Sequence, residues 1–174
     1  MKRILIIGSG GAGKSTFSKQ LSKILDLPII HLDVHFWLPG WEMTESKKWH
    51  NKVDELISQD SWVMDGNFNS TLDKRFKRAD TIFYFDFSRA RCLYNAFKRM
   101  ILGRYFLKKR SDMAEGCREK FDLEFYKWIW NFNKNHREEY YKMLDDLKEE
   151  KKVYIIRSYK EKIRVLEKIE NDIQ

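Results

Sequence analysis

The pattern of apolar and polar residues predicts short strands that alternate with helices along the chain. Runs rich in β-branched and aromatic residues are expected to be strands buried in a parallel sheet, and they lie at 4–7, 29–32, 62–64, 79–86 and 153–156. Apolar residues recur at helical spacing over 16–25, 46–58, 72–76, 89–102, 121–150 and 159–169, and the spacing leaves a break at 131–135 open. The sequence therefore predicts a three-layer α/β fold, with helices on both faces of a five-stranded parallel sheet.

The first predicted strand runs directly into residues 8–16, GSGGAGKST, which satisfy G-x-x-x-x-G-K-[ST] at every fixed position. Glycines allow successive backbone N–H groups to point at one anion, and the start of the following helix adds its positive end. Lys14 is expected to reach the β- and γ-phosphates of a nucleotide, and the Ser15 hydroxyl to bind Mg²⁺. The residues predicted to hold the nucleotide are Gly8, Gly10, Gly11, Ala12, Gly13, Lys14, Ser15 and Thr16.

The same glycines allow an alternative interpretation. Three of them also spell G-x-G-x-x-G, and Asp33 follows the last of these by 20 residues, close to where a dinucleotide-binding fold has its ribose-binding acid. A dinucleotide site, however, needs neither an ammonium group nor a magnesium-binding hydroxyl at the start of its helix. Lys14 and Ser15 therefore favour a mononucleotide site of the P-loop NTPase type.

Carboxylates follow the second and third predicted strands, and ligands of parallel sheets bind at the carboxyl ends of the strands. Asp65 ends the third strand, where it can hold Mg²⁺ through water; the alternative is that it caps a helix beginning near Asn69. Asp33 follows the second strand and can accept the proton of an alcohol acceptor. A monophosphate acceptor needs no base, so Asp33 favours a hydroxyl acceptor; the alternative is a loop carboxylate that caps a backbone N–H.

The segment after the second predicted strand combines aromatic residues with a Pro-Gly turn and is expected to bind the acceptor. The residues predicted to contact the acceptor are Asp33, His35, Trp37, Gly66 and Arg75. Structural alternatives stay open for several of them. Trp37 and Trp41 lie beside a turn, where aromatic residues often pack, and His31 and His35 have the alternative of satisfied structural imidazoles. The alternative for Arg75 is a solvated position on the surface.

A second segment, 103–118, has a glycine near each end and mixed charges between, which predicts a mobile loop that acts as a lid. Arginines that close over a transferred phosphoryl group can accelerate its transfer by about 10³ or more. The candidates are Arg99, Arg104 and Arg110, and Arg104 or Arg110 is expected to be catalytic. The aromatic residues that follow, Phe121, Phe125, Trp128 and Phe132, have helical spacing and are expected to lie in the core.

Composition limits the class of protein. The chain has 174 residues, 43% of them hydrophobic, and a net charge of +8. We expect one domain over 1–174, with 33–60 as an acceptor-binding insertion and 103–118 as the lid. Residues 89–120 contain ten Lys or Arg and three Asp or Glu, so this segment carries +7 and the remainder +1. A localised basic segment indicates an anionic partner, either a polyphosphate or a nucleic acid.

Other patterns exclude further classes. Cys92 and Cys117 lack the spacing of a metal site or a disulfide framework, and no apolar run approaches the ~20 residues of a membrane span. The chain begins directly with a strand and shows no signal peptide, so a cytoplasmic protein with reduced thiols is expected. Residues 51–54 spell the N-K-x-D of GTPases, but we reject this match because they lie in a predicted helix ahead of the third strand.

These motifs resemble the adenylate-kinase-like branch of P-loop kinases and, more closely, the bacterial DNA topology modulation (FlaR-related) proteins. The segments that carry the resemblance are GSGGAGKST, LDVHFWLPGW, WVMDGNF, the block 75–86 and RSDMAEGCREKFD. The resemblance implies ATP and Mg²⁺ as cofactors, a five-stranded parallel core, an acceptor segment after the second strand and an arginine-rich lid. The DGNF segment is similar to the D-G-F-P of nucleotide kinases but lacks the proline and the arginine after it, so the acceptor does not follow from the resemblance.

Two functions fit the sequence. The first is a small ATP-dependent kinase acting on a nucleoside, nucleotide or sugar, in which Lys14 holds the triphosphate, Ser15 and Asp65 hold Mg²⁺, and Asp33 orients or deprotonates the acceptor. The second is an ATP-binding, DNA-associated regulator with little or no kinase activity. The sequence contains no helix-turn-helix or zinc-finger motif, and a lid over phosphates needs basic residues in any case, so the kinase is favoured.

Overall fold

The computed structural model describes residues 1–106, 111–117 and 120–173. The strands of the central sheet are β1 (Arg3–Gly8), β2 (Ile29–His31), β5 (Trp62–Asp65), β6 (Thr81–Phe85) and β7 (Lys152–Ile156), and a separate hairpin consists of β3 (Trp37–Leu38) and β4 (Glu42–Met43). The helices are α1 (Lys14–Leu25), α2 (Leu32–Phe36), α3 (Ser46–Ser58), α4 (Leu72–Arg78), α5 (Arg89–Phe106), α6 (Leu123–Leu147) and α7 (Tyr159–Asn171), with a 3₁₀ turn η1 (Asn69–Thr71) before α4.

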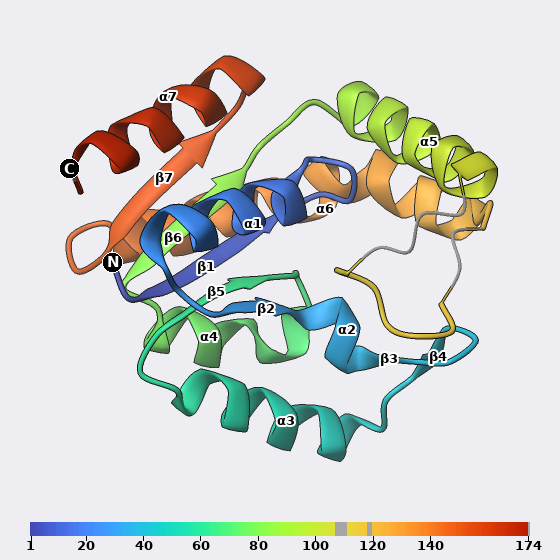
Figure 1. The fold of residues 1–174 in the computed structure, drawn as a ribbon, viewed down its shortest axis with the longest axis horizontal. Helices are drawn as coiled ribbons and strands as arrows, with labels where there is room; N and C mark the ends of the chain where they lie inside the picture. The colour runs from blue at the N-terminus through green and yellow to red at the C-terminus, as the bar shows by residue number, and fades with distance from the viewer. Residues whose placement is uncertain (107–110, 118–119, 174) are drawn as a thin grey trace.

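The central sheet has the strand order β2-β5-β1-β6-β7, so β1 lies in its middle (Figure 1). Its strands pair in parallel throughout. Apart from Arg3, every residue of β1 and β6 is buried, because their apolar runs face helices on both sides. The predicted three-layer α/β fold with a five-stranded parallel sheet is confirmed. Residues 51–54 lie in the middle of α3, which agrees with the rejection of the GTPase motif.

Helices cover both faces of the sheet and divide the core into two clusters (Figure 1). One cluster includes Trp49 of α3, Phe76 of α4 and Tyr140 of α6. The other includes Phe17 of α1 and Leu166 of α7, two helices that pack against each other. Because helices cover both faces, a ligand is expected at the carboxyl edge of the sheet. At this edge β1 leads into the glycine-rich loop.

Three features differ from the predicted elements. The short helix α2 and the β3–β4 hairpin occupy a stretch where the sequence pattern predicts a loop, because elements of two to five residues are too short to show a hydrophobic period. Helix α5 continues through Gly103, the predicted start of the lid loop, because one glycine costs a helix only about 1 kcal/mol. Helix α6 has no break, and the amide of Asn133 donates to the carbonyl of Phe87 instead of competing with the helix backbone.

The aromatic stripe at the start of α6 lies in the core only in part. Phe132 is 1% exposed, as predicted, but Trp128 is 37% and Phe121 61% exposed. Phe125 lies against Gly10 of the glycine-rich loop. The prediction of a uniform core stripe is therefore wrong, because the first half of α6 extends past the sheet and contacts this loop and solvent (Figure 1).

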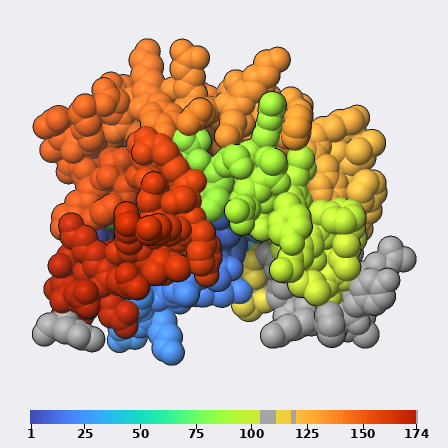
Figure 2. Space-filling model, turned by 90° about the horizontal axis from the view of Figure 1, so that it is seen from above, coloured from blue at the N-terminus to red at the C-terminus, as the bar shows by residue number. Residues whose placement is uncertain are grey.

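Helix α5 packs along α6, and with α7 these helices form one broad face of the molecule (Figure 2). A hollow separates α5 from α7 on this face, and residues near the N-terminus are visible in it and beneath α7. Within the described residues, no helix combines the length and the apolar composition needed to cross a membrane.

Candidate active site

The glycine-rich loop ends where α1 begins at Lys14. Gly13 precedes the helix in a left-handed conformation, with φ of 89°, and no side chain of the described residues caps the helix. The first turn of α1 also contains no acidic residue. The N–H groups at this helix start therefore point toward a position that suits an anion, as the sequence predicts.

Two glycines of the loop, Gly11 and Gly10, pack closely against α5 and α6. A Cβ atom on Gly11 would lie 2.1 Å from the carbonyl oxygen of Cys92 in α5, and one on Gly10 would lie 2.9 Å from the ring of Phe125 in α6. The Asn95 side chain of α5 also donates to the Gly11 carbonyl over 2.9 Å. Helices α5 and α6 therefore support the loop from outside.

Lys14 folds back over the loop. Its Nζ donates to the carbonyl oxygens of Gly8 at 2.7 Å and Ser9 at 2.9 Å. Burial lowers the pKa of the ammonium group, while the negative charges of Asp65 and Asp33 raise it. The structure thus brings the predicted lysine and both predicted carboxylates within electrostatic reach of one another.

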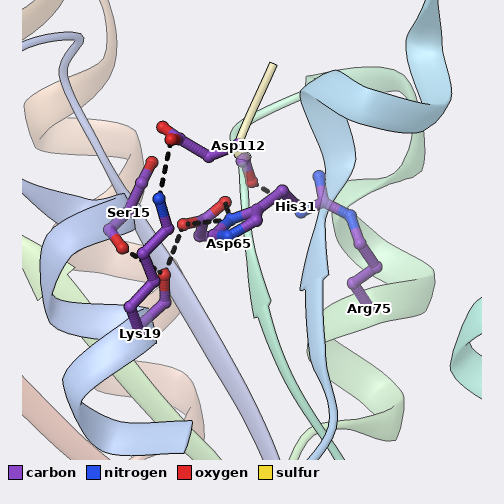
Figure 3. Close-up of polar contacts among 8 residues, drawn as sticks. Ser15, Lys19, His31, Asp65, Arg75 and Asp112 are labelled. Carbon is purple, nitrogen blue, oxygen red and sulfur yellow. Dashed lines mark hydrogen bonds and ion pairs between the residues drawn. The ribbon is translucent and has the colours of Figure 1, made fainter. Parts of the chain in front are cut away.

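Asp65 is held between α1 and β2 (Figure 3). Its carboxylate is 2% exposed, and the Ser18 hydroxyl donates to Oδ2 over 2.6 Å. Nδ1 of His31 lies 2.9 Å from Oδ1 and 3.0 Å from Oδ2, and because a carboxylate only accepts, this nitrogen carries the proton. The cap of the η1 turn is Phe68, so the alternative of Asp65 as a helix cap is wrong.

Ser15 and Asp65 could supply part of the ligand set of a magnesium ion, and other ligands would have to supply the rest. Ser15 stands in the first turn of α1, and the Ser18 hydroxyl that holds Asp65 lies 3.0 Å from the Ser15 carbonyl. No group of three or more His, Cys, Asp or Glu that could hold a metal is found in the described part of the chain. A Mg²⁺ ion here would need phosphate oxygens and water, which is how Mg²⁺ is usually bound beside a nucleotide.

Asn67 is a site residue that the sequence analysis missed. Gly8 N–H donates to Asn67 Oδ1 over 3.0 Å, and Asn67 Nδ2 donates to the Gly8 carbonyl over 2.9 Å. This pair of hydrogen bonds joins the segment after β5 to the first residue of the glycine-rich loop. The signal that can find Asn67 is its place directly after a strand that pairs with β1.

Arg75 contradicts the alternative of a solvated position. It is 0% exposed, and four of its five guanidinium N–H groups donate to the carbonyl oxygens of Thr71, Gly66, Asn67 and Phe68. Burial lowers the pKa of Arg75 to about 9, which keeps it charged at neutral pH. In Figure 3 it lies across β2 and β5 from α1. We conclude that Arg75 fixes the backbone of residues 66–68.

Asp33 lies in α2, close to the hairpin. The indole N–H of Trp37 donates to Asp33 Oδ1 over 3.1 Å, and the Trp37 ring lies 4.8 Å from that of Phe36 and 5.5 Å from that of Trp41. Trp37 therefore both packs and orients a carboxylate. The alternative of a loop carboxylate for Asp33 is wrong, because the residue is helical.

The two remaining predicted acceptor residues are His35, which also belongs to α2, and Gly66, which follows β5. Burial lowers the pKa of His35, and the charges of Lys52 and Glu55 in α3 act on it, so His35 is associated with α3. Gly66 has φ of 130°, and a Cβ there would lie 2.8 Å from Leu32. Its carbonyl is one of those bound by Arg75. Contact of His35 and Gly66 with an acceptor stays a prediction.

Residues 111–117, from the predicted lid, contact α1 and the hairpin. Lys19 of α1 forms an ion pair with Asp112 over 2.8 Å (Figure 3). Gly40 N–H donates to the Gly116 carbonyl over 3.4 Å, and the Cys117 thiol to the Leu38 carbonyl over 3.2 Å. Cys92 and Cys117 are both buried free thiols, as the sequence predicts.

The predicted lid arginines can be placed only in part. Arg110 lies outside the described residues, and Arg104 belongs to α5 with its side chain outside the described part. Arg99 of α5 acts electrostatically on Lys14 and lowers its pKa. Arg99 is the lid candidate whose side chain lies within the described part of the chain, and it acts on the lysine of the loop.

Comparisons with solved structures find this fold in small-molecule kinases. The shikimate kinase of Aquifex aeolicus matches 98% of this chain and 95% of its own, with a TM-score of 0.58 and 17% identity. That of Acinetobacter baumannii, in complex with shikimate, matches 99% and 93%, with a TM-score of 0.56 and 16% identity. The deoxyadenosine kinase of M. mycoides matches 98% and 99%, with a TM-score of 0.50 and 16% identity. The chain therefore has a P-loop kinase fold. No family model and no curated protein matches it.

Proposed function

We propose that the protein is a small ATP-dependent kinase that transfers the γ-phosphate of ATP, with Mg²⁺, to a small-molecule acceptor. The observation that carries this proposal is one of position: Asp65 ends β5, Asp33 follows β2 and Lys14 begins α1, so all three belong to the carboxyl edge of the parallel sheet. No side chain of the described residues caps the start of α1. A lysine and loop N–H groups suit a chain of phosphates, and the carboxylates suit a metal ion and an acceptor group. The P-loop kinase fold supports the same assignment.

In the proposed transfer, Asp33 accepts the proton of an acceptor hydroxyl as its oxygen bonds to the γ-phosphorus. The bond from that phosphorus to the β,γ-bridging oxygen breaks, and its electron pair stays with ADP. Lys14 and the N–H groups of the loop stabilise the charge on the phosphate oxygens. Asp33 then releases the proton to solvent.

We propose that Ser15 and Asp65 hold Mg²⁺, which neutralises phosphate charge. Ser15 would bind it through its hydroxyl and Asp65 through water. The hydrogen bonds from His31 and Ser18 support this role, because they fix the Asp65 carboxylate before a metal arrives. For the arginine that covers the transferred group, Arg104 and Arg110 remain the proposed residues, and the effect of Arg99 on Lys14 supports a position of α5 beside the phosphates.

We also propose that the chain belongs to the DNA topology modulation group, whose motifs it shares, and that it is a cytoplasmic protein.

The alternative function, an ATP-binding regulator associated with DNA, has one observation in its favour. Arg89 stands 4.2 Å above the ring of Trp130, which is 45% exposed, so the outer face of α5 and α6 combines a cation with an aromatic ring. DNA binding that weakens steeply with salt and changes with ATP would favour this alternative.

The test is a coupled ADP-release assay over nucleosides, nucleoside monophosphates and sugars. We expect one acceptor to raise turnover well above the ATPase background. We also expect Lys14→Ala to lower that turnover by about 10³, as loss of a phosphate-stabilising charge does. Lys23→Ala is the matched control, since Lys23 is an exposed residue in the last turn of α1. If no acceptor raises turnover above background, the kinase proposal fails.

A further inference from the structure

We infer that the acceptor is a neutral polyhydroxylated molecule, such as a nucleoside or sugar, and that it carries no phosphate group. This inference rests on the proposed kinase function and names the substrate class of the same site. Three features carry it: two carboxylates at the carboxyl edge of the sheet, the internal use of Arg75, and the tryptophan that orients one of these carboxylates.

A second phosphate would lie beside two carboxylates. Asp65 ends β5 and Asp33 follows β2, so both belong to the carboxyl edge of the sheet, where Lys14 begins α1. A phosphorylated acceptor would bring about two further negative charges beside the γ-phosphate and these carboxylates. A neutral hydroxyl brings none, and its proton has an acceptor in Asp33.

Arg75 cannot compensate for that charge from its present position. It follows the DGN segment on the acceptor side, and the sequence predicts that it contacts the acceptor. Its guanidinium instead donates to backbone carbonyls, and it is 0% exposed. Releasing it to bind a phosphate would leave those buried carbonyls without donors, which is unfavourable.

The hydrogen bond from Trp37 orients the Asp33 carboxylate, which suits an acceptor hydroxyl. A carboxylate that takes a proton in phosphoryl transfer has to point one oxygen at the acceptor, and the indole N–H of Trp37 fixes its orientation through Oδ1. The same side chain belongs to an aromatic group with Phe36 and Trp41, which offers flat apolar surface for a sugar or base ring. Trp37 is thus a positioning residue that acts through Asp33.

Hydrogen bonds of residues 111–117 support this arrangement from outside. Gly40 donates to the Gly116 carbonyl, and Pro39 would contact any Cβ atom placed on Gly116, at 2.9 Å. The hairpin that carries Trp37 is therefore held against residues 111–117. Such contacts favour a fixed aromatic and acidic surface for an acceptor.

The test compares matched pairs of acceptors in the ADP-release assay: each nucleoside with its 5′-monophosphate, and each free sugar with its sugar phosphate. We expect the neutral member of the best pair to have a kcat/KM at least tenfold higher. Equal or faster turnover of the phosphorylated member overturns the inference and leaves the kinase function standing. Absence of turnover with every acceptor overturns the proposed function itself, and the inference with it.

Two variants separate catalysis from positioning. Asp33→Asn should lower kcat with the neutral acceptor by about 10² to 10⁴ and leave the KM for ATP unchanged, because only the proton acceptor is lost. Trp37→Phe keeps a ring but removes the N–H, and it should lower kcat less than Asp33→Asn does. Combining the two should give no loss beyond that of Asp33→Asn alone. Additive losses would contradict a positioning role.

A control variant is available on the surface. Asp60→Asn removes an exposed carboxylate after α3 and should keep wild-type kcat and melting temperature. If Asp33→Asn keeps wild-type kcat as well, Asp33 is not the proton acceptor and the argument for a hydroxyl acceptor fails.

Discussion

Residues on the proposed nucleotide side are held at the ends of central strands, whereas those on the proposed acceptor side belong to α2 and the β3–β4 hairpin. Asp65 ends β5 and is bound by His31, the last residue of the neighbouring β2. Trp37 and Asp33, by contrast, sit in elements of two and five residues. The difference shows that one side of the site is fixed by the sheet and the other by local aromatic packing.

Backbone conformation adds a further difference. Positive φ occurs at glycines on both sides, such as Gly11 and Gly13 of the loop and Gly40 of the hairpin. On the acceptor side it also occurs at Trp41, with φ of 68°, a conformation that costs a residue with a side chain about 1–2 kcal/mol. The packing of Trp41 on Trp37 helps to offset that cost. The acceptor side is therefore expected to change conformation more readily than the nucleotide side.

The largest effect is expected at Arg75, which fixes the segment that joins the two sides. Arg75→Met leaves buried carbonyls at residues 66–68 and 71 unpaired, so we expect it to lower the free energy of unfolding by about 3 kcal/mol or more. Urea denaturation measures this change. Arg164→Met, at an exposed position of α7, is the control. A loss within the ~0.5 kcal/mol of ordinary surface substitutions would mean that Arg75 does not fix this segment.

The next effect concerns pH and the nucleotide side alone. Burial lowers the pKa of Lys14 below 10.5, and bound phosphate should raise it again. As pH rises through the lowered pKa, the free protein loses the charge that phosphates need, so ATP affinity should fall by up to about tenfold per unit. Calorimetry in buffers of different ionisation enthalpy should show proton uptake on ATP binding in this range. Lys14→Arg stays protonated and should show no uptake.

A smaller effect is expected at Asn67. Asn67→Ala removes both hydrogen bonds to Gly8, together worth about 2 kcal/mol, so ATP affinity should fall by up to about thirtyfold. Titration calorimetry with ATP measures the loss, and Asn171→Ala at the exposed end of α7 serves as the control. If Asn67→Ala weakens acceptor binding but leaves ATP affinity unchanged, the residue belongs to the acceptor side instead.

The smallest effect is expected where residues 111–117 meet α1. The Lys19 side chain is 42% exposed, so its ion pair with Asp112 should contribute less than about 1 kcal/mol. A double-mutant cycle of Lys19→Met and Asp112→Asn, followed by thermal unfolding, measures this coupling energy. A coupling well above this value would show that the lid segment is fixed as firmly as the nucleotide side.

The sequence predicts the nucleotide side better than the acceptor side for a physical reason. The roles of Lys14 and Ser15 follow from a local motif on a strand and a helix, and both elements show a clear hydrophobic period. Asn67 and Ser18 act through contacts between distant segments, which no local pattern reports. The hydrogen bond of His31 to Asp65 follows only from the strand register, which pairs these two residues on β2 and β5.

Arg75 shows how composition can mislead where spacing is informative. An arginine on a helix is usually solvated, which is the reason for expecting a surface or substrate-binding role. Its spacing from Leu72 and Phe76, however, is that of the buried face of α4, and both neighbours are core residues. A polar residue at an apolar position of a helix pattern indicates a buried side chain with partners to satisfy.

The packing of Gly10 on Phe125 also has an evolutionary consequence. The two positions lie 115 residues apart in the sequence, yet a Cβ on one would lie 2.9 Å from the ring of the other. A descendant of this chain can enlarge residue 10 only after shortening residue 125, so the two should change together across homologues. Packing against the glycine-rich loop therefore limits which side chains α6 can have at position 125.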